Sequence, residues 1–432
     1  MLRILSTNDP ASENVIARLI DRASDERAVE PRVREILEAV REKGDGALLA
    51  FTKEFDGVTL LPDELKVAER EIEAAAEAVD PTAKAAIAAA KARIEAFHRH
   101  EIRQSWHVQQ DGTTFGQLVR PLEVVGVYVP GGEASYPSTV LMNAVPAVLA
   151  GVERIPMITP PKKDGRVDPT VLFAAALCGI NEIYRVGGAQ AIAALAYGTA
   201  TVPKVDKIVG PGSAYVNVAK RLVFGDVAID SLAGPSEIVV LADGDASPAT
   251  IAADLLSQAE HDALATACLV TPSQSLAEAV NAEIDRQIAD LKRKDVIAAC
   301  LEGRGAILIV DDLEEGIALI NRIAPEHLEV MVDYWLDVLP RLRNAGMILL
   351  GEYSPVPLCD YGAGPNHVLP TSGTARFASP LGVADFTKRM NYLHATREGF
   401  GALADQVETL AEHEGFTAHA AAVRIRRGAN DG

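Results

Sequence analysis

The spacing of hydrophobic residues divides the chain into stretches with different periodicities. Between residues 14 and 103, apolar positions recur at helical spacing in segments that open on a proline or an acidic residue, which predicts successive amphipathic helices. The segments are residues 30–43, 62–79 and 81–100. We therefore expect residues 1–120 to form an all-helical N-terminal segment that packs on the second of two α/β domains.

From residue 121 onward, apolar β-branched runs alternate with alanine-rich helical stretches. The first round gives strands at residues 124–129, 154–159, 182–186 and 207–209, with helices at 138–150, 169–178 and 189–197. The second gives strands at residues 237–241, 265–271, 305–310 and 347–350, with helices at 248–261, 275–291 and 313–323. Apolar strands that feed crossover helices build parallel sheets, so we predict an α/β fold with domains at residues 121–236 and 237–379.

The last part of the chain, residues 380–432, returns to helical patterns. A helical extension this short has little hydrophobic core of its own. We therefore expect it to dock on another surface, for which a second subunit is one candidate.

Composition narrows the class of protein. Of 432 residues, 48% are hydrophobic and 23% are charged, and the net charge of −19 disfavours nonspecific binding to nucleic acid or anionic membrane. No apolar stretch approaches about 18 residues, and the N-terminus lacks the apolar core of a signal peptide, which favours a cytoplasmic protein. The four cysteines form no C-x-x-C pair, so no disulfide scaffold is indicated. We expect a small-molecule partner.

Four of the nine histidines lie in polar clusters that interrupt apolar sequence toward the C-terminus. They are His261, His327, His367 and His419. Imidazoles, carboxylates and carboxamides supply zinc ligands and general bases, so these dispersed clusters indicate one site assembled by folding, and an enzyme is the leading hypothesis. His98 and His100 lie outside the clusters at a charged helix end, where we expect both to be solvated.

Local spacing suggests roles for the residues beside these histidines. Gln258 and His261 are three residues apart on a predicted helix, so they could bind one metal together or form an ordinary polar helix end. Glu326 and His327 follow a proline, where a carboxylate and an imidazole could divide two proton transfers or lie as a surface pair.

A loop rich in glycine, proline and small polar residues covers residues 359–373. Long ordered loops inside compact domains are usually functional. Asp360 could complete a metal site and His367 could contact a substrate, or either could brace the loop.

Two glycine-containing turns follow predicted strands, at residues 130–132 and 210–212. Glycine there allows backbone amides to approach a phosphate at a helix N-terminus, although an ordinary tight turn has the same composition. Neither turn is G-x-G-x-x-G, and no Walker A or G-x-S-x-G sequence occurs. These turns alone are therefore weak support for a nucleotide site, and a serine hydrolase has none.

Taken together, the segments resemble the histidinol dehydrogenase family over nearly the whole chain. The segments that carry the resemblance are residues 125–132, 187–192, 233–237, 257–261, 324–329, 366–371, 375–377 and 414–419. The resemblance implies a zinc-dependent, NAD-linked oxidation of L-histidinol through L-histidinaldehyde to L-histidine. Two NAD molecules are reduced per turnover in these final steps of histidine biosynthesis.

The same resemblance implies a role for individual residues. The implied zinc ligands, for one zinc ion per subunit, are Gln258, His261, Asp360 and His419. Glu326 would activate water and His327 would take the hydroxyl proton. Besides His327 and the zinc ligands, the implied substrate-binding residues are Ser236, His367 and Glu414. NAD would contact Tyr128, Gln190, Ser213 and the turn at residues 210–212.

The family architecture implied is an intertwined homodimer, in which each subunit has two incomplete Rossmann-like domains. The C-terminal extension would carry Glu414 and His419 into the partner's site. Ser213 stands where the family usually has asparagine, which puts NAD affinity in question. The alternatives are a related zinc and NAD enzyme for another small polar alcohol, a zinc hydrolase and a catalytically dead scaffold.

Overall fold

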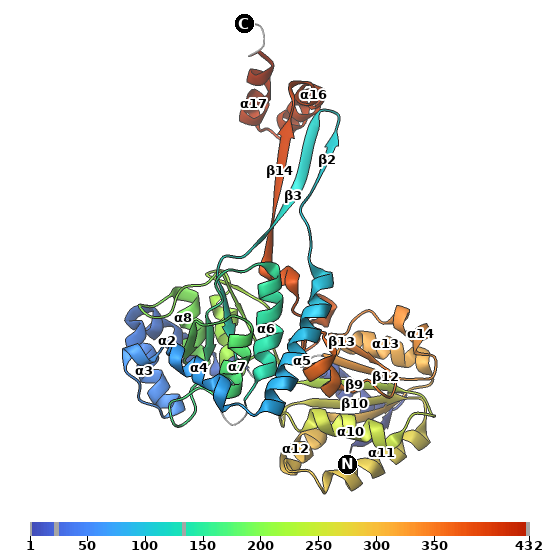
Figure 1. Ribbon diagram of the computed structural model, residues 1–432. Helices are drawn as coiled ribbons and strands as arrows, with labels where there is room; N and C mark the ends of the chain where they lie inside the picture. Colours follow the sequence, from blue (N-terminus) through green and yellow to red (C-terminus); the bar gives the residue numbers. More distant parts are fainter. Residues whose placement is uncertain (1, 21–25, 132–134, 429–432) are drawn as a thin grey trace.

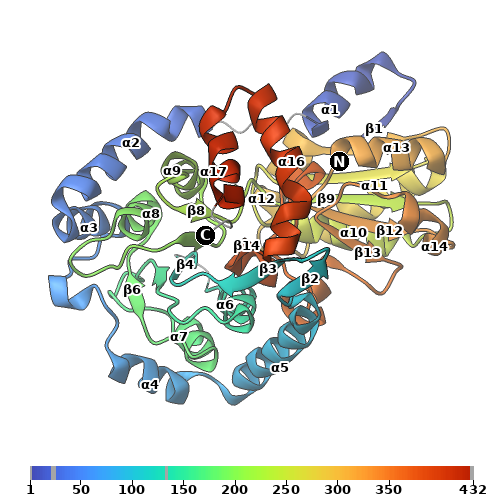
Figure 2. The same ribbon diagram turned by 90° about the horizontal axis from the view of Figure 1, so that it is seen from above.

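The computed structural model describes residues 2–20, 26–131 and 135–428. Two α/β halves lie side by side, and a narrow arm projects from between them (Figures 1 and 2). Each half has a parallel sheet covered by helices, so the predicted α/β fold with two parallel-sheet domains is confirmed. Among the described residues, no helix combines the length and apolar character needed to cross a lipid bilayer.

The first half is built on a five-stranded parallel sheet with the order β6-β5-β4-β7-β8. Its strands are β4 (Val125–Tyr128), β5 (Met157–Thr159), β6 (Ile183–Arg185), β7 (Lys207–Val209) and β8 (Ala228–Ile229). The helices between them are α6 (Pro137–Ala150), α7 (Pro169–Leu177), α8 (Gly188–Tyr197) and α9 (Ala214–Val223). β4 and β5 are buried along their whole length because helices cover both faces of the sheet.

The second half has a six-stranded parallel sheet with the order β1-β11-β10-β9-β12-β13. Its strands are β1 (Arg3–Ser6), β9 (Glu237–Ala242), β10 (Thr266–Thr271), β11 (Gly305–Ile309), β12 (His327–Met331) and β13 (Met347–Leu350). Its helices are α1 (Pro10–Ile20), α10 (Pro248–Ala259), α11 (Gln274–Ile288), α12 (Lys294–Arg304), α13 (Leu313–Ile323), α14 (Trp335–Val338) and α15 (Val356–Leu358). The strands β1, β8 and β12 were not predicted.

The arm consists of an antiparallel three-stranded sheet that ends in two helices (Figure 1). Its elements are β2 (Trp106–Gln110), β3 (Thr113–Pro121), β14 (Thr387–Ala395), α16 (Arg397–His413) and α17 (Thr417–Gly428). The turn between β2 and β3 is Asp111-Gly112, and both residues have positive φ, as a tight hairpin of right-handed twist requires.

The prediction of an all-helical N-terminal segment is wrong, because β1, β2 and β3 lie within residues 1–120. The segment packs on both halves. β1 and α1 lie against the second half, and α5 (Pro81–His98) contacts residues 359–363 of that half. Besides this contact, α2 (Glu26–Lys43), α4 (Glu69–Ala78) and α5 contact α8, α9, α7 and α6 of the first half. The apolar side of α2 explains why this helix packs on the first half, because Ile36 and Val40 join the core that also contains Ile192 of α8. The remaining helix of the segment is α3 (Asp45–Phe51).

The C-terminal part of the chain is also not purely helical. Residues 387–395 form β14, which pairs with β3 along its whole length. Most of β14 is exposed, so its sequence lacks the regular apolar alternation from which a strand is recognised. The helices α16 and α17 at the arm tip are as expected.

Candidate active site

A cavity of about 180 Å³ lies where the carboxyl edge of the first sheet faces the amino edge of the second. The turn after β7 contributes Pro211 from the first half, while the starts of β9 and β12 line the cavity from the second. Residues predicted from far-apart segments meet here. Those that line the cavity are Ser236, Gln258, His261, Glu326, His327, Asp360 and His367.

His327, the first residue of β12, is 4% exposed. Its Nδ1 lies 3.0 Å from the backbone oxygen of Glu237. A carbonyl oxygen only accepts, so Nδ1 carries the hydrogen and Nε2 keeps its lone pair. Within the described residues Nε2 has no hydrogen-bond partner and lies 4.0 Å from Asp360 Oδ1. Burial lowers the pKa of His327 to about 4, so the ring is a neutral base at ordinary pH.

Glu326 is fixed by a reciprocal bond with Glu237 between the starts of β12 and β9. Glu326 Oε2 accepts from the Glu237 N–H at 2.8 Å, and Glu237 Oε2 accepts from the Glu326 N–H at 3.2 Å. The second oxygen of Glu237 accepts from the Ser372 N–H at 2.9 Å. Glu326 Oε2 is also 3.6 Å from His327 Nδ1, so the two candidate bases lie side by side.

Three side chains of the cavity offer metal-binding atoms. Gln258 lies in the last turn of α10, a helix that starts at the Ser247 cap and Pro248, and its buried Oε1 has no hydrogen-bond partner in the described chain. Burial raises the pKa of Asp360 to about 7. His261 lies just after α10 and is more exposed. Partial burial of its ring still disfavours the protonated imidazole, which lowers the pKa of His261. An unpartnered carboxamide oxygen and a carboxylate without a cation fit a dication.

Two predicted residues lie elsewhere in the chain. Glu414 directly follows α16 and His419 lies on α17, so both are exposed at the arm tip, far from the cavity of the same subunit (Figure 1). Among the described residues, no group of three His, Cys, Asp or Glu side chains could hold a metal.

His367 lines the cavity from the loop after α15. Its Nδ1 donates to the backbone oxygen of Asp360 at 3.2 Å, and burial lowers its pKa to about 4. Ser236, directly before β9, is half-buried and lines the cavity together with Ala233 and Gly234. Both side chains offer polar atoms to a small molecule rather than a net charge.

The residues predicted for the cofactor all lie at the carboxyl edge of the first sheet. Tyr128 ends β4, is buried, and accepts from the Gly188 N–H at 3.2 Å; burial raises its pKa to about 12. Gln190 on α8 is 1% exposed, and its Oε1 has no partner in the described residues. Ser213 caps α9 without a side-chain bond and is exposed. Unused polar atoms at this edge fit a dinucleotide.

The chain matches known proteins over nearly its whole length. The family model for histidinol dehydrogenase matches residues 20–427. The chain belongs to the histidinol dehydrogenase family. The resemblance carried by the sequence motifs is therefore confirmed, and the protein is an NAD-dependent oxidoreductase.

Individual members of the histidinol dehydrogenase family support the same assignment. The histidinol dehydrogenase of Caldanaerobacter subterraneus subsp. tengcongensis is 52% identical over 400 residues, 93% of each chain. That of Listeria monocytogenes serotype 4b is 54% identical over 399 residues, which cover 92% of this chain and 93% of the other. The crystal structure of histidinol dehydrogenase from Elizabethkingia anophelis aligns with a TM-score of 0.94 at 35% identity, over 100% of this chain and 99% of that one.

One buried residue near this histidinol dehydrogenase site was misjudged from the sequence. His98, expected at the surface, is 0% exposed, and its Nδ1 lies 2.8 Å from Glu101 Oε2. Its Nε2 is 3.4 Å from the side chain of Asn366, the residue before His367. The spacing of three between His98 and Glu101 was the available signal, since it places both on one helix face. His100 is exposed as expected.

Proposed function

We propose that this protein oxidises L-histidinol through L-histidinaldehyde to L-histidine, with zinc and two molecules of NAD per turnover. This would complete histidine biosynthesis in the cytoplasm. The observation that carries the proposal is the neutral His327, whose Nε2 lone pair faces the same cavity as Gln258, His261 and Asp360. Family membership supports the reaction class.

Zinc would be held by Gln258, His261 and Asp360, which all line the cavity. The metal would supply a Lewis acid that orients the imidazole and amino nitrogens of the substrate, so that its hydroxyl carbon is positioned for reaction. Ser236 and His367, on the same cavity wall, would bind the remaining polar atoms. This arrangement leaves His327 free for proton transfer.

The two candidate bases would act in sequence. His327 Nε2 would take the hydroxyl proton of the alcohol while a hydride leaves the carbon, which gives the aldehyde. Glu326 would then take a proton from the water that adds to the aldehyde, while His327 returns its proton to the aldehyde oxygen. The hydrate would lose the second hydride, and His327 would take a hydroxyl proton from it, which gives the acid. Each hydride would pass to a separate NAD molecule, which Tyr128, Gln190 and Ser213 would contact at the edge of the first sheet.

The site would be completed by a second subunit. Glu414 and His419 lie on the arm tip, outside the cavity of their own chain (Figure 1). An exposed arm of this kind has few contacts with its own subunit and offers a surface that a homodimer would bury. We therefore propose that Glu414 and His419 of the partner subunit reach the cavity, with His419 as the fourth zinc ligand.

His327→Asn tests the assigned base. The variant should lower the rate of NADH formation from L-histidinol by at least about a hundredfold, because general bases contribute that much to proton transfer. The bound zinc, measured by elemental analysis, should stay within about twofold, since His327 is not a proposed ligand. The same substitution at the exposed His100 is the matched control.

The outcomes separate the alternatives. Equal loss of zinc and of activity in His327→Asn would contradict the role of this residue. If the wild-type protein with zinc and NAD forms no NADH from L-histidinol but turns over another alcohol, the substrate is wrong. Activity that needs zinc but not NAD would instead indicate a hydrolase.

A further inference from the structure

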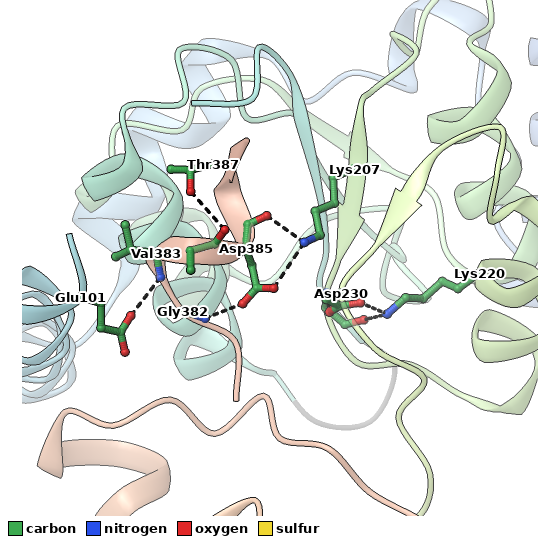
Figure 3. Close-up of polar contacts among 10 residues, drawn as sticks. Glu101, Lys207, Lys220, Asp230, Gly382, Val383, Asp385 and Thr387 are labelled. Carbon is green, nitrogen blue, oxygen red and sulfur yellow. Dashed lines mark hydrogen bonds and ion pairs between the residues drawn. The ribbon is translucent and has the colours of Figure 1, made fainter. Parts of the chain in front are cut away.

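Two charged side chains are buried behind the cavity in the first half. Lys220 on α9 and Asp230, just after β8, form an ion pair, and their side chains are only 1% and 4% exposed (Figure 3). Removing two charges from water costs free energy that their mutual attraction does not always recover. Since neither side chain takes part in the proposed chemistry, the pair requires another explanation.

Both members of the pair hold the same backbone residue. The Gly210 N–H donates to Asp230 Oδ2 at 2.8 Å, and Lys220 Nζ donates to the Gly210 oxygen at 3.0 Å. Gly210 has a φ of 115°, and a Cβ there would lie 2.0 Å from the backbone oxygen of Tyr128. The chain after β7 is therefore held in a conformation that only glycine adopts, with its two polar backbone groups fixed by buried charges.

A second side chain of α9 extends this bracing toward the substrate side. The Asn217 Nδ2 group donates to the backbone oxygens of Gly212, at 3.4 Å, and of Ala233, while its Oδ1 accepts from the Ala233 N–H at 3.3 Å. Pro211 and Ala233 both line the cavity. One face of α9 thus joins the turn at residues 210–212 to the segment that leads into Ser236.

We propose that Lys220 and Asp230 are positioning residues for cofactor binding, because together they hold the turn at residues 210–212 in the conformation that receives NAD. The inference rests on the proposed placement of NAD against this turn. The ion pair is internally neutral and buried, so it acts through the turn rather than by attracting the phosphates. Loss of the pair should weaken binding of the dinucleotide without touching the chemical step.

The double variant Lys220→Met/Asp230→Asn tests this. It removes both charges at nearly constant volume, so no unpaired charge stays buried. We expect the Kd for NADH, measured by fluorescence titration without substrate, to rise about tenfold. The KM for NAD should rise by a similar factor, while kcat and the KM for L-histidinol stay within about twofold.

The first sheet offers a matched control. Lys207, at the other end of β7, pairs with Asp385 at 3.4 Å and donates to its backbone oxygen at 2.7 Å (Figure 3). Within the described residues it makes no hydrogen bond or ion pair with the turn. Lys207→Met/Asp385→Asn should lower the Tm yet leave the Kd for NADH unchanged. A purely structural role for Lys220 and Asp230 predicts that both double variants affect NADH binding equally.

Three results would overturn the proposal. The first is a folded Lys220→Met/Asp230→Asn protein with the wild-type Kd for NADH, which would leave the proposed function intact. The second is equal loss of affinity in the control. The third is a wild-type protein that binds no NADH, which would remove the proposed function as well. If the double variant does not fold, Lys220→Arg, which keeps the ion pair but changes the donor to the Gly210 oxygen, should still raise the Kd about threefold, and an unchanged Kd would count against the proposal.

Discussion

Glu329 is a buried acid that has no part in the proposed chemistry. It follows His327 by two residues on β12 and is 1% exposed. Its Oε1 accepts from the Val356 N–H at 3.2 Å, and its carboxyl group lies beside that of Asp254. Burial, together with the charge of Asp254 beside it, raises the pKa of Glu329 well above its ordinary value of 4.5. The folded protein therefore keeps Glu329 protonated at neutral pH.

Glu329→Gln should stabilise the protein at alkaline pH. The folded-state pKa is raised, so the stability contribution of this group is full below about pH 4.5 and is lost as the pH rises toward the folded-state value. Glutamine resembles the neutral acid and has no proton to lose. We expect the gain in Tm over wild type to be about 2–4 °C larger at pH 8 than at pH 5, measured by differential scanning calorimetry.

The exposed Glu302 provides the control for Glu329→Gln. Glu302→Gln should shift the Tm by the same small amount at both pH values, because an exposed carboxylate keeps its hydration. A Glu329→Gln protein whose gain in Tm does not grow with pH would show that Glu329 is ionised in the folded state.

Residue types and spacing selected the histidines and their polar neighbours as candidates, the family resemblance added Ser236 and Glu414, and neither could assign the states of these side chains. Gln258 and His261 were recognisable as a possible pair from their spacing on one helix face, and the structure places both on the cavity. The hydrogen on His327 Nδ1 could not be predicted, because its acceptor, the Glu237 oxygen, lies 90 residues away. The burial of His98 depends in the same way on distant chain, since Asn366 lies beside it.

At the scale of elements, periodicity identified the buried strands and missed the exposed ones. The predicted strand at residues 207–209 coincides with β7, whose residues are all buried. β2 and β14 are almost entirely exposed, so no core selects apolar residues at alternate positions. Their pairing with β3 is set by backbone hydrogen bonds and by the Asp111-Gly112 turn instead.

Gly116 is a position where the arm sheet leaves no room for a side chain. A Cβ there would lie 2.3 Å from the Trp106 backbone oxygen and 2.9 Å from the His107 Cα, both on the neighbouring strand β2. Gly116→Val should therefore separate β2 from β3 and misplace the arm tip. We expect light scattering to show loss of the proposed dimer and the rate of NADH formation to fall at least about tenfold, while circular dichroism shows retained helices.

Thr114→Val is the control for this variant, because it adds the same β-branched side chain on the same face of β3 without a glycine being replaced. It should remain dimeric and active. A Gly116→Val protein that is also dimeric and fully active would show that the arm geometry has no role in assembly.

At the scale of the whole molecule, the cavity and the arm tip divide the proposed site between two places that one chain cannot bring together. The cavity residues come from the facing edges of two sheets, while Glu414 and His419 lie beyond a three-stranded sheet (Figure 1). The sequence indicated this through the missing core of its last 50 or so residues and through the family resemblance, which implies that Glu414 and His419 enter the partner's site. Whether the arm reaches the cavity of its own subunit or that of a partner therefore depends on how subunits assemble.

Mixing two inactive variants distinguishes an arm that acts in the partner's site from one that acts in its own. His327→Asn damages the cavity and His419→Ala damages the arm. In a heterodimer with exchanged arms, the cavity of the His419→Ala chain receives an intact arm from the His327→Asn chain, so one of two sites is fully wild type. Random pairing in co-expressed protein should therefore restore about a quarter of the wild-type rate of NADH formation.

The control pairs two variants of the same cavity, His327→Asn and Glu326→Gln. Each site of their heterodimer keeps one damaged base, so co-expression should restore no activity above the sum of the two homodimers. Arms that serve their own subunit would leave both mixtures inactive, because every chain would then carry its defect within its own site. Recovery confined to the mixture with His419→Ala thus requires both a dimer and an exchanged arm, which neither cavity geometry nor chain length alone can establish.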